Sequence, residues 1–186
     1  MKLSTLKDWA KAQAARTIWA YGPDELVTRL RKIGVTPGST LMFHSSWRPH
    51  NGFQGKPADV VRALKAAVGE GGLLVMPSMP YHNMSSAQWL ATGKPMNVAR
   101  SPSMMGIVSE VFRRSAGVVR SLSVTHPLLA WGRDADAFVA GHEAAGGRDF
   151  DAAGRRIGPV HAEHHGNLSG VRNVLQQLLG LAAPQV

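Results

Sequence analysis

The stretch TLMFHSS, residues 40–46, is a short apolar run that ends in three polar side chains. A nearly continuous apolar run of this length is typical of a strand that is buried on both faces. A second such run, LLVM at residues 73–76, is closed by Pro77. The segment 57–68 between them has Val and Leu at helical spacing, which predicts a helix. The order strand, helix, strand indicates an α/β fold.

Further elements are predicted on either side of this unit. Helices are expected over 23–33, 104–115 and 135–142, and short strands over 118–121 and 128–131. Residues 78–103 are irregular and rich in Met, Pro, Ser and Asn, and a loop this long is usually functional or mobile. We therefore expect an α/β layered fold with a mainly parallel central sheet flanked by helices, in which 40–44 and 73–76 are buried central strands. We expect one domain over residues 1–186, with an N-terminal extension at 1–22 and a divergent C-terminal segment at 146–186.

Length and composition exclude several classes of protein. The chain has 186 residues, of which 44% are hydrophobic and 18% charged, so it is not a disordered chain. The absence of cysteine excludes a disulfide scaffold, a cysteine zinc site, a thiol nucleophile and an iron–sulfur cluster. No apolar run approaches the roughly 20 residues that span a bilayer, and the first residues are too charged for a signal peptide. A soluble cytoplasmic protein is expected.

The charge distribution favours an anionic partner. Lys and Arg number 21 against 12 Asp and Glu, a net charge of +9, and residues 1–100 carry +8 of it. Nucleic acid, an anionic membrane surface, a polyphosphate cofactor or a merely solvated basic surface would each suit this excess. No helix-turn-helix, zinc finger or aromatic-studded sheet motif accompanies it, so a nucleic-acid-binding module is the weaker alternative.

Four motifs in a fixed order point to a known family. They are HSS at 44–46, GG followed by VMP at 71–77, MGIVSEVFR at 105–113, and VVRSLSVTHPLLAWG at 118–132. In this order, over residues 24–143, the chain resembles the aminoglycoside 3-N-acetyltransferase family. That family contains antibiotic-resistance enzymes with an α/β fold that transfer an acetyl group from acetyl-coenzyme A to an amine.

The resemblance implies an acyltransferase whose partners are coenzyme A and a small amine acceptor, and no metal is expected. It implies a coenzyme-binding set that consists of His44, Ser45, Ser46, Arg120 and Ser121. Serine hydroxyls and backbone N–H groups suit phosphate oxygens, and the Arg120 guanidinium is a planar cation for a phosphate. His126 is the expected catalytic residue, because amine acetylation needs a base that titrates near neutral pH.

Two features depart from the family pattern. The His-Pro pair comes three residues later than in many members, with Ser123 and Val124 in the usual place. Residues 146–186 do not follow the pattern, and the Thr-x-x-His-x-x-Glu segment of the family has no counterpart in them. A divergent or truncated ending is expected from this. An inactive coenzyme-binding remnant is therefore the alternative to an active transferase.

The acceptor site is the least defined part of the prediction. Aminoglycosides are polycations, and Glu110 is a candidate carboxylate for them that does not lie at a helix start. Because the chain is basic, we expect weak or absent aminoglycoside acetylation by this chain alone. The segment HAEHH at 161–165 has no second ligand pair, so no metal site is expected there.

Overall fold

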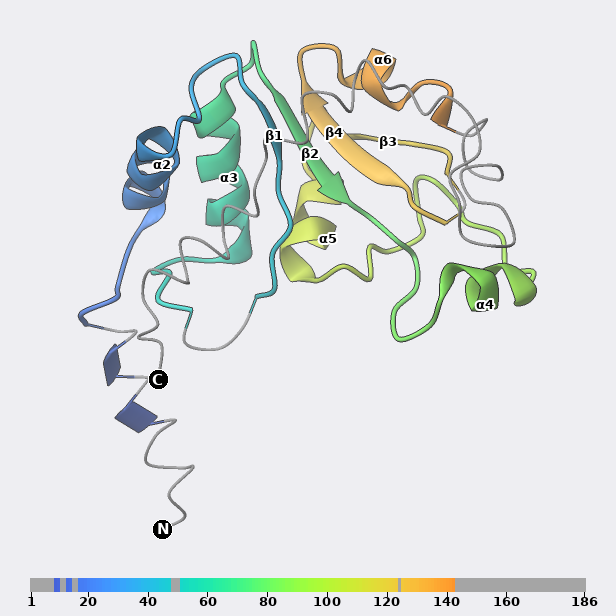
Figure 1. The fold of residues 1–186 in the computed structure, drawn as a ribbon, viewed down its shortest axis with the longest axis horizontal. Coiled ribbons are helices and arrows are strands. Elements are labelled where there is room, and N and C mark those ends of the chain that lie inside the picture. Colours follow the sequence, from blue (N-terminus) through green and yellow to red (C-terminus); the bar gives the residue numbers. More distant parts are fainter. Residues whose placement is uncertain (1–8, 11–12, 15–16, 48–50, 124, 143–186) are drawn as a thin grey trace.

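The computed structural model describes residues 9–10, 13–14, 17–47, 51–123 and 125–142 (Figure 1). Their elements are, in chain order, α2 (Pro23–Lys32), β1 (Thr40–Met42), α3 (Pro57–Val68), β2 (Leu73–Pro77), α4 (Ser86–Ala91), α5 (Ile107–Arg113), β3 (Val119–Arg120), β4 (Leu128–Gly132) and α6 (Ala135–Val139). The segment 146–186, with its HAEHH cluster, and most of the extension 1–22 lie outside the described residues.

The four strands form one mixed sheet in the order β1-β2-β4-β3. β1 and β2 run parallel, whereas β4 runs antiparallel to both β2 and β3. In the described part of the chain, the expectation of a mainly parallel sheet is therefore wrong. The central position expected for residues 40–44 is wrong as well, because β1 lies at one edge of this sheet.

Connection length explains the strand directions. The chain between β1 and β2 contains α3, which is long enough for the crossover that a parallel pair requires. The chain between β3 and β4, residues 121–127, is too short for such a crossover, so these strands must pair antiparallel. The predicted α/β class is thus confirmed, with a mixed sheet in place of a mainly parallel one.

The core lies where α2, α3 and α5 pack together and α3 meets the sheet (Figure 1). Its largest fully buried side chains include Leu30, Leu64, Leu74, Met76, Phe112 and Leu129. β2 is buried as predicted, since Leu74, Val75 and Met76 are at most 1% exposed. β1 is less buried than predicted, because Thr40 is exposed and Met42 is only half-buried.

The helix predicted at 57–68 is confirmed as α3, and side-chain contacts secure both of its ends. Pro57 begins it with a φ angle suited to the first turn, and the carboxylate of Asp59 accepts the backbone N–H of Lys56 (2.6 Å). At the other end, Arg31 of α2 donates to the carbonyls of Ala67 (2.5 Å) and Val35 (2.8 Å). This guanidinium satisfies a carbonyl that the helix end leaves free and joins α2 to α3.

Two other helices differ from their predicted bounds, and a third helix is not predicted. The helices expected over 104–115 and 135–142 are shorter, as α5 and α6. The loop at 78–103 contains an unpredicted helix, α4, which begins with a capping box: Gln88 N–H donates to Ser85 Oγ (3.2 Å), and Ser85 N–H donates to Gln88 Oε1 (2.7 Å). None of the helices among the described residues is long and apolar enough to cross a membrane.

Candidate functional site

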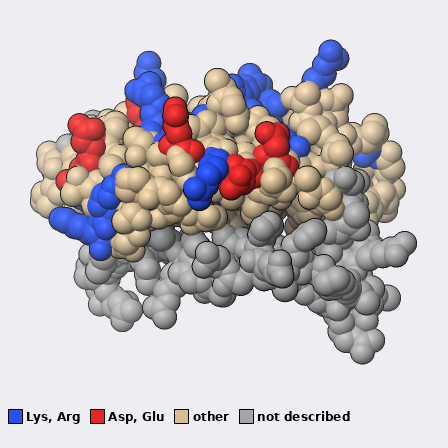
Figure 2. Space-filling model, turned by 90° about the horizontal axis from the view of Figure 1, so that it is seen from above, with Lys and Arg blue, Asp and Glu red and all other residues tan. Residues whose placement is uncertain are grey.

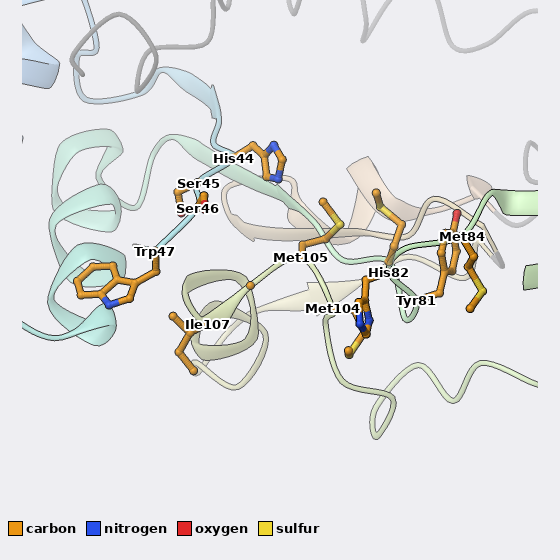
Figure 3. A pocket seen from close by; sticks show the side chains of 12 residues that line it. His44, Ser45, Ser46, Trp47, Tyr81, His82, Met84, Met104, Met105 and Ile107 are labelled. Carbon is orange, nitrogen blue, oxygen red and sulfur yellow. The ribbon is translucent and has the colours of Figure 1, made fainter. Parts of the chain in front are cut away.

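A pocket of about 480 Å³ opens where β1 and β2 end (Figure 3). One side of it is the HSS segment with Trp47, and the remaining lining comes from residues 79–107. We call it the β1 pocket; its twelve lining residues are His44, Ser45, Ser46, Trp47, Met79, Tyr81, His82, Met84, Met104, Met105, Gly106 and Ile107. Carboxyl ends of parallel strands are where open α/β sheets hold their ligands, and this parallel pair follows that rule.

The structure brings His44, Ser45 and Ser46 together at this pocket, as the sequence predicts. His44 and Ser46 are exposed and Ser45 is half-buried. Within the described part of the chain, none of these three side chains has a hydrogen-bond partner. The pocket therefore presents two hydroxyls and an imidazole on the side toward β1.

The opposite wall of the β1 pocket is apolar and adaptable. Four methionines line it, and Met84 and Met104 are 42% and 38% exposed. Thioether side chains are flexible and polarisable, so they can fit surfaces of irregular shape. No Asp, Glu, Lys or Arg occurs among the twelve described lining residues. A charged ligand must therefore be held there by hydroxyls, imidazoles and backbone groups.

Arg120 does not line this pocket, contrary to its predicted place beside Ser45 and Ser46. Its side chain is buried, with the residue 9% exposed, and it donates to the carbonyls of Ser101 (2.5 Å), Ser78 and Val98 (3.5 Å). Burial lowers the pKa of Arg120 to about 10, so the guanidinium stays charged at neutral pH. Its two terminal nitrogens, Nη1 and Nη2, donate to backbone carbonyls, which gives Arg120 a structural role that the sequence does not reveal.

Ser121 is also removed from the pocket. It is 1% exposed, and its Oγ accepts the backbone N–H of Leu128 (2.9 Å). The same Oγ lies 2.7 Å from His142 Nδ1. These contacts tie the β3–β4 connection to the segment after α6, and they leave Ser121 no route to a ligand in the β1 pocket.

His126 reaches the β1 pocket only through other side chains. Its Nδ1 lies 3.0 Å from Thr125 Oγ1, and its Nε2 lies 3.4 Å from Ser86 Oγ. Ser86 Oγ is 2.9 Å from the hydroxyl of Tyr81, which in turn donates to the Thr125 carbonyl (2.8 Å). Since Tyr81 donates to that carbonyl, Ser86 must donate to Tyr81, and Nε2 of His126 then donates to Ser86. Both ring nitrogens are thus engaged, and Tyr81 is the member that lines the pocket.

Glu110 is held by neighbouring cations. Its carboxylate accepts both Nε (2.8 Å) and Nη2 (2.7 Å) of Arg113, Nε of Arg114 (2.6 Å) and the backbone N–H of Ser103 (2.8 Å). The hydrogen bonds from Arg113 above all lower the pKa of Glu110 to about 2, against the opposing effect of burial. Glu110 is not part of the described lining, so its carboxylate is not offered to an amine in this pocket.

Sequence reasoning missed the functional candidates on the far wall of the pocket. Tyr81 and His82 follow β2 just as His44 and Ser45 follow β1, so the rule about strand ends identifies them too. The ring of Tyr81 stacks on Trp89 of α4 with centroids 5.4 Å apart. Trp47 directly follows the HSS motif, and its ring meets that of Phe53 edge-on at 6.0 Å.

Comparison with known proteins gives the same family that the motifs suggest. The profile described as aminoglycoside 3-N-acetyltransferase matches residues 42–149. Aminoglycoside N(3)-acetyltransferase IV of Salmonella sp is 39% identical over 106 residues, which cover 55% of this chain and 36% of the relative. The chain spans about a third to a half of the length of the curated relatives it matches.

Two solved structures of similar fold contain ligands. A mutant of aminoglycoside acetyltransferase AAC(3)-IVa in complex with a gentamicin has 34% identity and a TM-score of 0.53, over 64% of this chain and 43% of that chain. AAC-IIIb in a binary complex with CoASH has a TM-score of 0.54 over 66% of this chain and 50% of that chain; at 23% identity it shows the fold alone. Since the family profile covers more than half of the residues, the chain belongs to the aminoglycoside 3-N-acetyltransferase family.

Proposed function

We propose that this chain takes part in acetyl-coenzyme-A-dependent N-acetylation of an aminoglycoside or a similar amine, with the coenzyme at the β1 pocket. The observation that carries the proposal is the HSS segment, which follows a parallel strand and places Ser45 and Ser46 at a pocket. Support comes from the family match and from similar folds that hold a gentamicin and CoASH. Hydroxyls and backbone N–H groups of Ser45 and Ser46 would bind phosphate oxygens.

The chemistry requires a base near the acceptor. The amine nitrogen bonds to the carbonyl carbon of the thioester, the carbon–sulfur bond breaks, and the nitrogen loses a proton while the thiolate gains one. His44 and His82 are the imidazoles that line the described pocket, and an imidazole accepts such a proton near neutral pH. In this proposal His126 is a positioning residue, which acts on the pocket through Ser86 and Tyr81.

The described lining of the β1 pocket offers no carboxylate to a polycationic acceptor. Glu110, which lies outside that lining, is neutralised by two arginines. Figure 2 shows basic and acidic side chains interspersed over the described residues of one face, without a continuous field of either sign there. The net charge of +9 opposes a polycation at long range. We therefore expect poor acceptor binding even where the coenzyme binds.

Turnover is expected to be slow for this reason. With acetyl-coenzyme A and either a gentamicin-like or a kanamycin-like acceptor, we expect thiol release far slower than ~1 per second, which is the lower range of ordinary enzymes. The measurement is acceptor-dependent thiol release, with acetyl-coenzyme A alone as the control. Turnover at ~1 per second or faster would contradict the argument from charge. Acceptor-independent thiol release alone would contradict the proposed acetyl transfer.

A further inference from the structure

One wall of the β1 pocket is carried by a long loop with little regular structure of its own. Residues 78–106 run from the end of β2 to the start of α5 and contain only the short helix α4. Seven of the twelve lining residues come from this loop, and four of them are the methionines Met79, Met84, Met104 and Met105. A free loop of this length would occupy many conformations, so the pocket shape depends on what fixes its ends.

Arg120 of β3 contacts both ends of this loop. Its guanidinium donates to the Ser78 carbonyl, next to β2, and to the Ser101 carbonyl (2.5 Å), close to α5. One planar cation thus links two carbonyls that lie more than twenty residues apart in the sequence. The flat fork of an arginine suits two acceptors at once, whereas a lysine ammonium is a point donor.

A second charged group, Arg113, secures the end of the loop that lies near α5. Arg113 of α5 donates to the Ala99 carbonyl (2.6 Å), and its side chain is 10% exposed. Glu110 holds Arg113 through two hydrogen bonds and accepts the backbone N–H of Ser103. Loop residues 98–103, which directly precede the lining residues Met104 and Met105, are therefore held by side chains from β3 and α5.

We propose that Arg120, supported by the Arg113–Glu110 pair, is a positioning clamp that sets the far wall of the β1 pocket. The identity of the ligand, coenzyme A, rests on the proposed function. In this chain the arginine of the family's Arg-Ser motif would then position the loop and would not contact a phosphate. Because Arg120 is buried and its Nη donors are committed to carbonyls, it acts on the ligand only through the loop.

The test compares backbone hydrogen exchange and coenzyme affinity in Arg120→Lys and Arg120→Ala, with no ligand present during exchange. We expect amides within 79–103 to exchange about tenfold faster in Arg120→Lys, because lysine keeps the charge but cannot bridge both carbonyls. Coenzyme A should bind about tenfold more weakly to the same variant. Arg133→Lys, at an arginine that is 67% exposed and paired with Asp134, is the control and should match the wild type.

Each outcome decides between the clamp and its alternatives. Faster exchange confined to 79–103, with amides of α3 and β2 unchanged, supports the clamp. Exchange unchanged in 79–103, or accelerated equally in α3 and β2, overturns it. Where Arg120→Ala does not fold, Arg120→Lys and Arg113→Lys give the same comparison. If the wild type does not bind coenzyme A, the proposed function fails while the exchange result still decides the clamp.

Discussion

Replacement of Gly132 by alanine is expected to lower the free energy of unfolding by about 3 kcal/mol or more, because it combines backbone strain with a steric clash. Gly132 ends β4 opposite Leu73 and has a φ of +107°, a region that L side chains rarely adopt. A Cβ atom at this position would lie 2.1 Å from the carbonyl oxygen of Gly72. Since that neighbour is backbone, the strain and the clash both destabilise the β2–β4 pairing.

Denaturant unfolding measures this effect directly. The matched control is Gly71→Ala, because a Cβ at Gly71 would meet no atom within 4 Å and its φ is not positive. We expect the control to stay within about 0.5 kcal/mol of the wild type, as surface substitutions usually do. A Gly132→Ala protein as stable as this control would show that β2 and β4 do not approach as closely as described.

Stability in acid is expected to depend strongly on Glu110. The pKa of this carboxyl is about 2 in the fold and near 4.5 when unperturbed, so the unfolded chain takes up its proton first as the pH falls. The stabilisation is fully present above pH 4.5 and is lost as the pH falls toward 2. A difference of this size corresponds to an effect on the order of 3 kcal/mol.

The variant that tests this is Glu110→Gln, studied by unfolding at several pH values. We expect it to be less stable than the wild type at pH 7, and the gap should close between about pH 5 and about pH 2. Glu25→Gln, which removes an exposed ion pair with Arg29, is the control and should follow the wild-type profile. If wild type and Glu110→Gln lose stability in parallel below about pH 5, the Arg113–Glu110 pair does not hold the carboxyl as described.

The elements that the sequence predicts best are those whose apolar residues follow a regular pattern along the chain. The helix at 57–68 and the buried strand at 73–76 are found as predicted, because each shows its periodicity within a few residues. The antiparallel course of β4 is not among the predictions, although the short connection at 121–127 rules out a parallel one. Helix α4 is not predicted, because residues 78–103 are interpreted as an irregular loop. The spacing of Ser85 and Gln88 is nevertheless that of a capping box at a helix start.

Some residues of the candidate site lie where the sequence predicts them, and others do not. His44, Ser45 and Ser46 are predicted together because they are adjacent in sequence and follow a strand. Arg120 and Glu110 are expected at the ligand site, and the structure places both outside the lining of the β1 pocket. The sequence shows the charge of each side chain but does not show the groups that it contacts in the fold. Their partners are carbonyls and cations of other residues, such as the Ser78 carbonyl and Arg113, and only the fold brings these together.

The central claim, that coenzyme A binds beside the HSS segment, is tested most directly by calorimetric titration of coenzyme A. We expect binding to the wild type and an affinity lower by at least about tenfold in the Ser45→Ala, Ser46→Ala double variant, since hydroxyls that bind phosphate are lost. Ser115→Ala, whose hydroxyl donates to the Val111 carbonyl away from the pocket, is the control and should bind as the wild type does. Equal affinity in the wild type and the double variant, or binding of a DNA oligomer in place of coenzyme A, would contradict the claim.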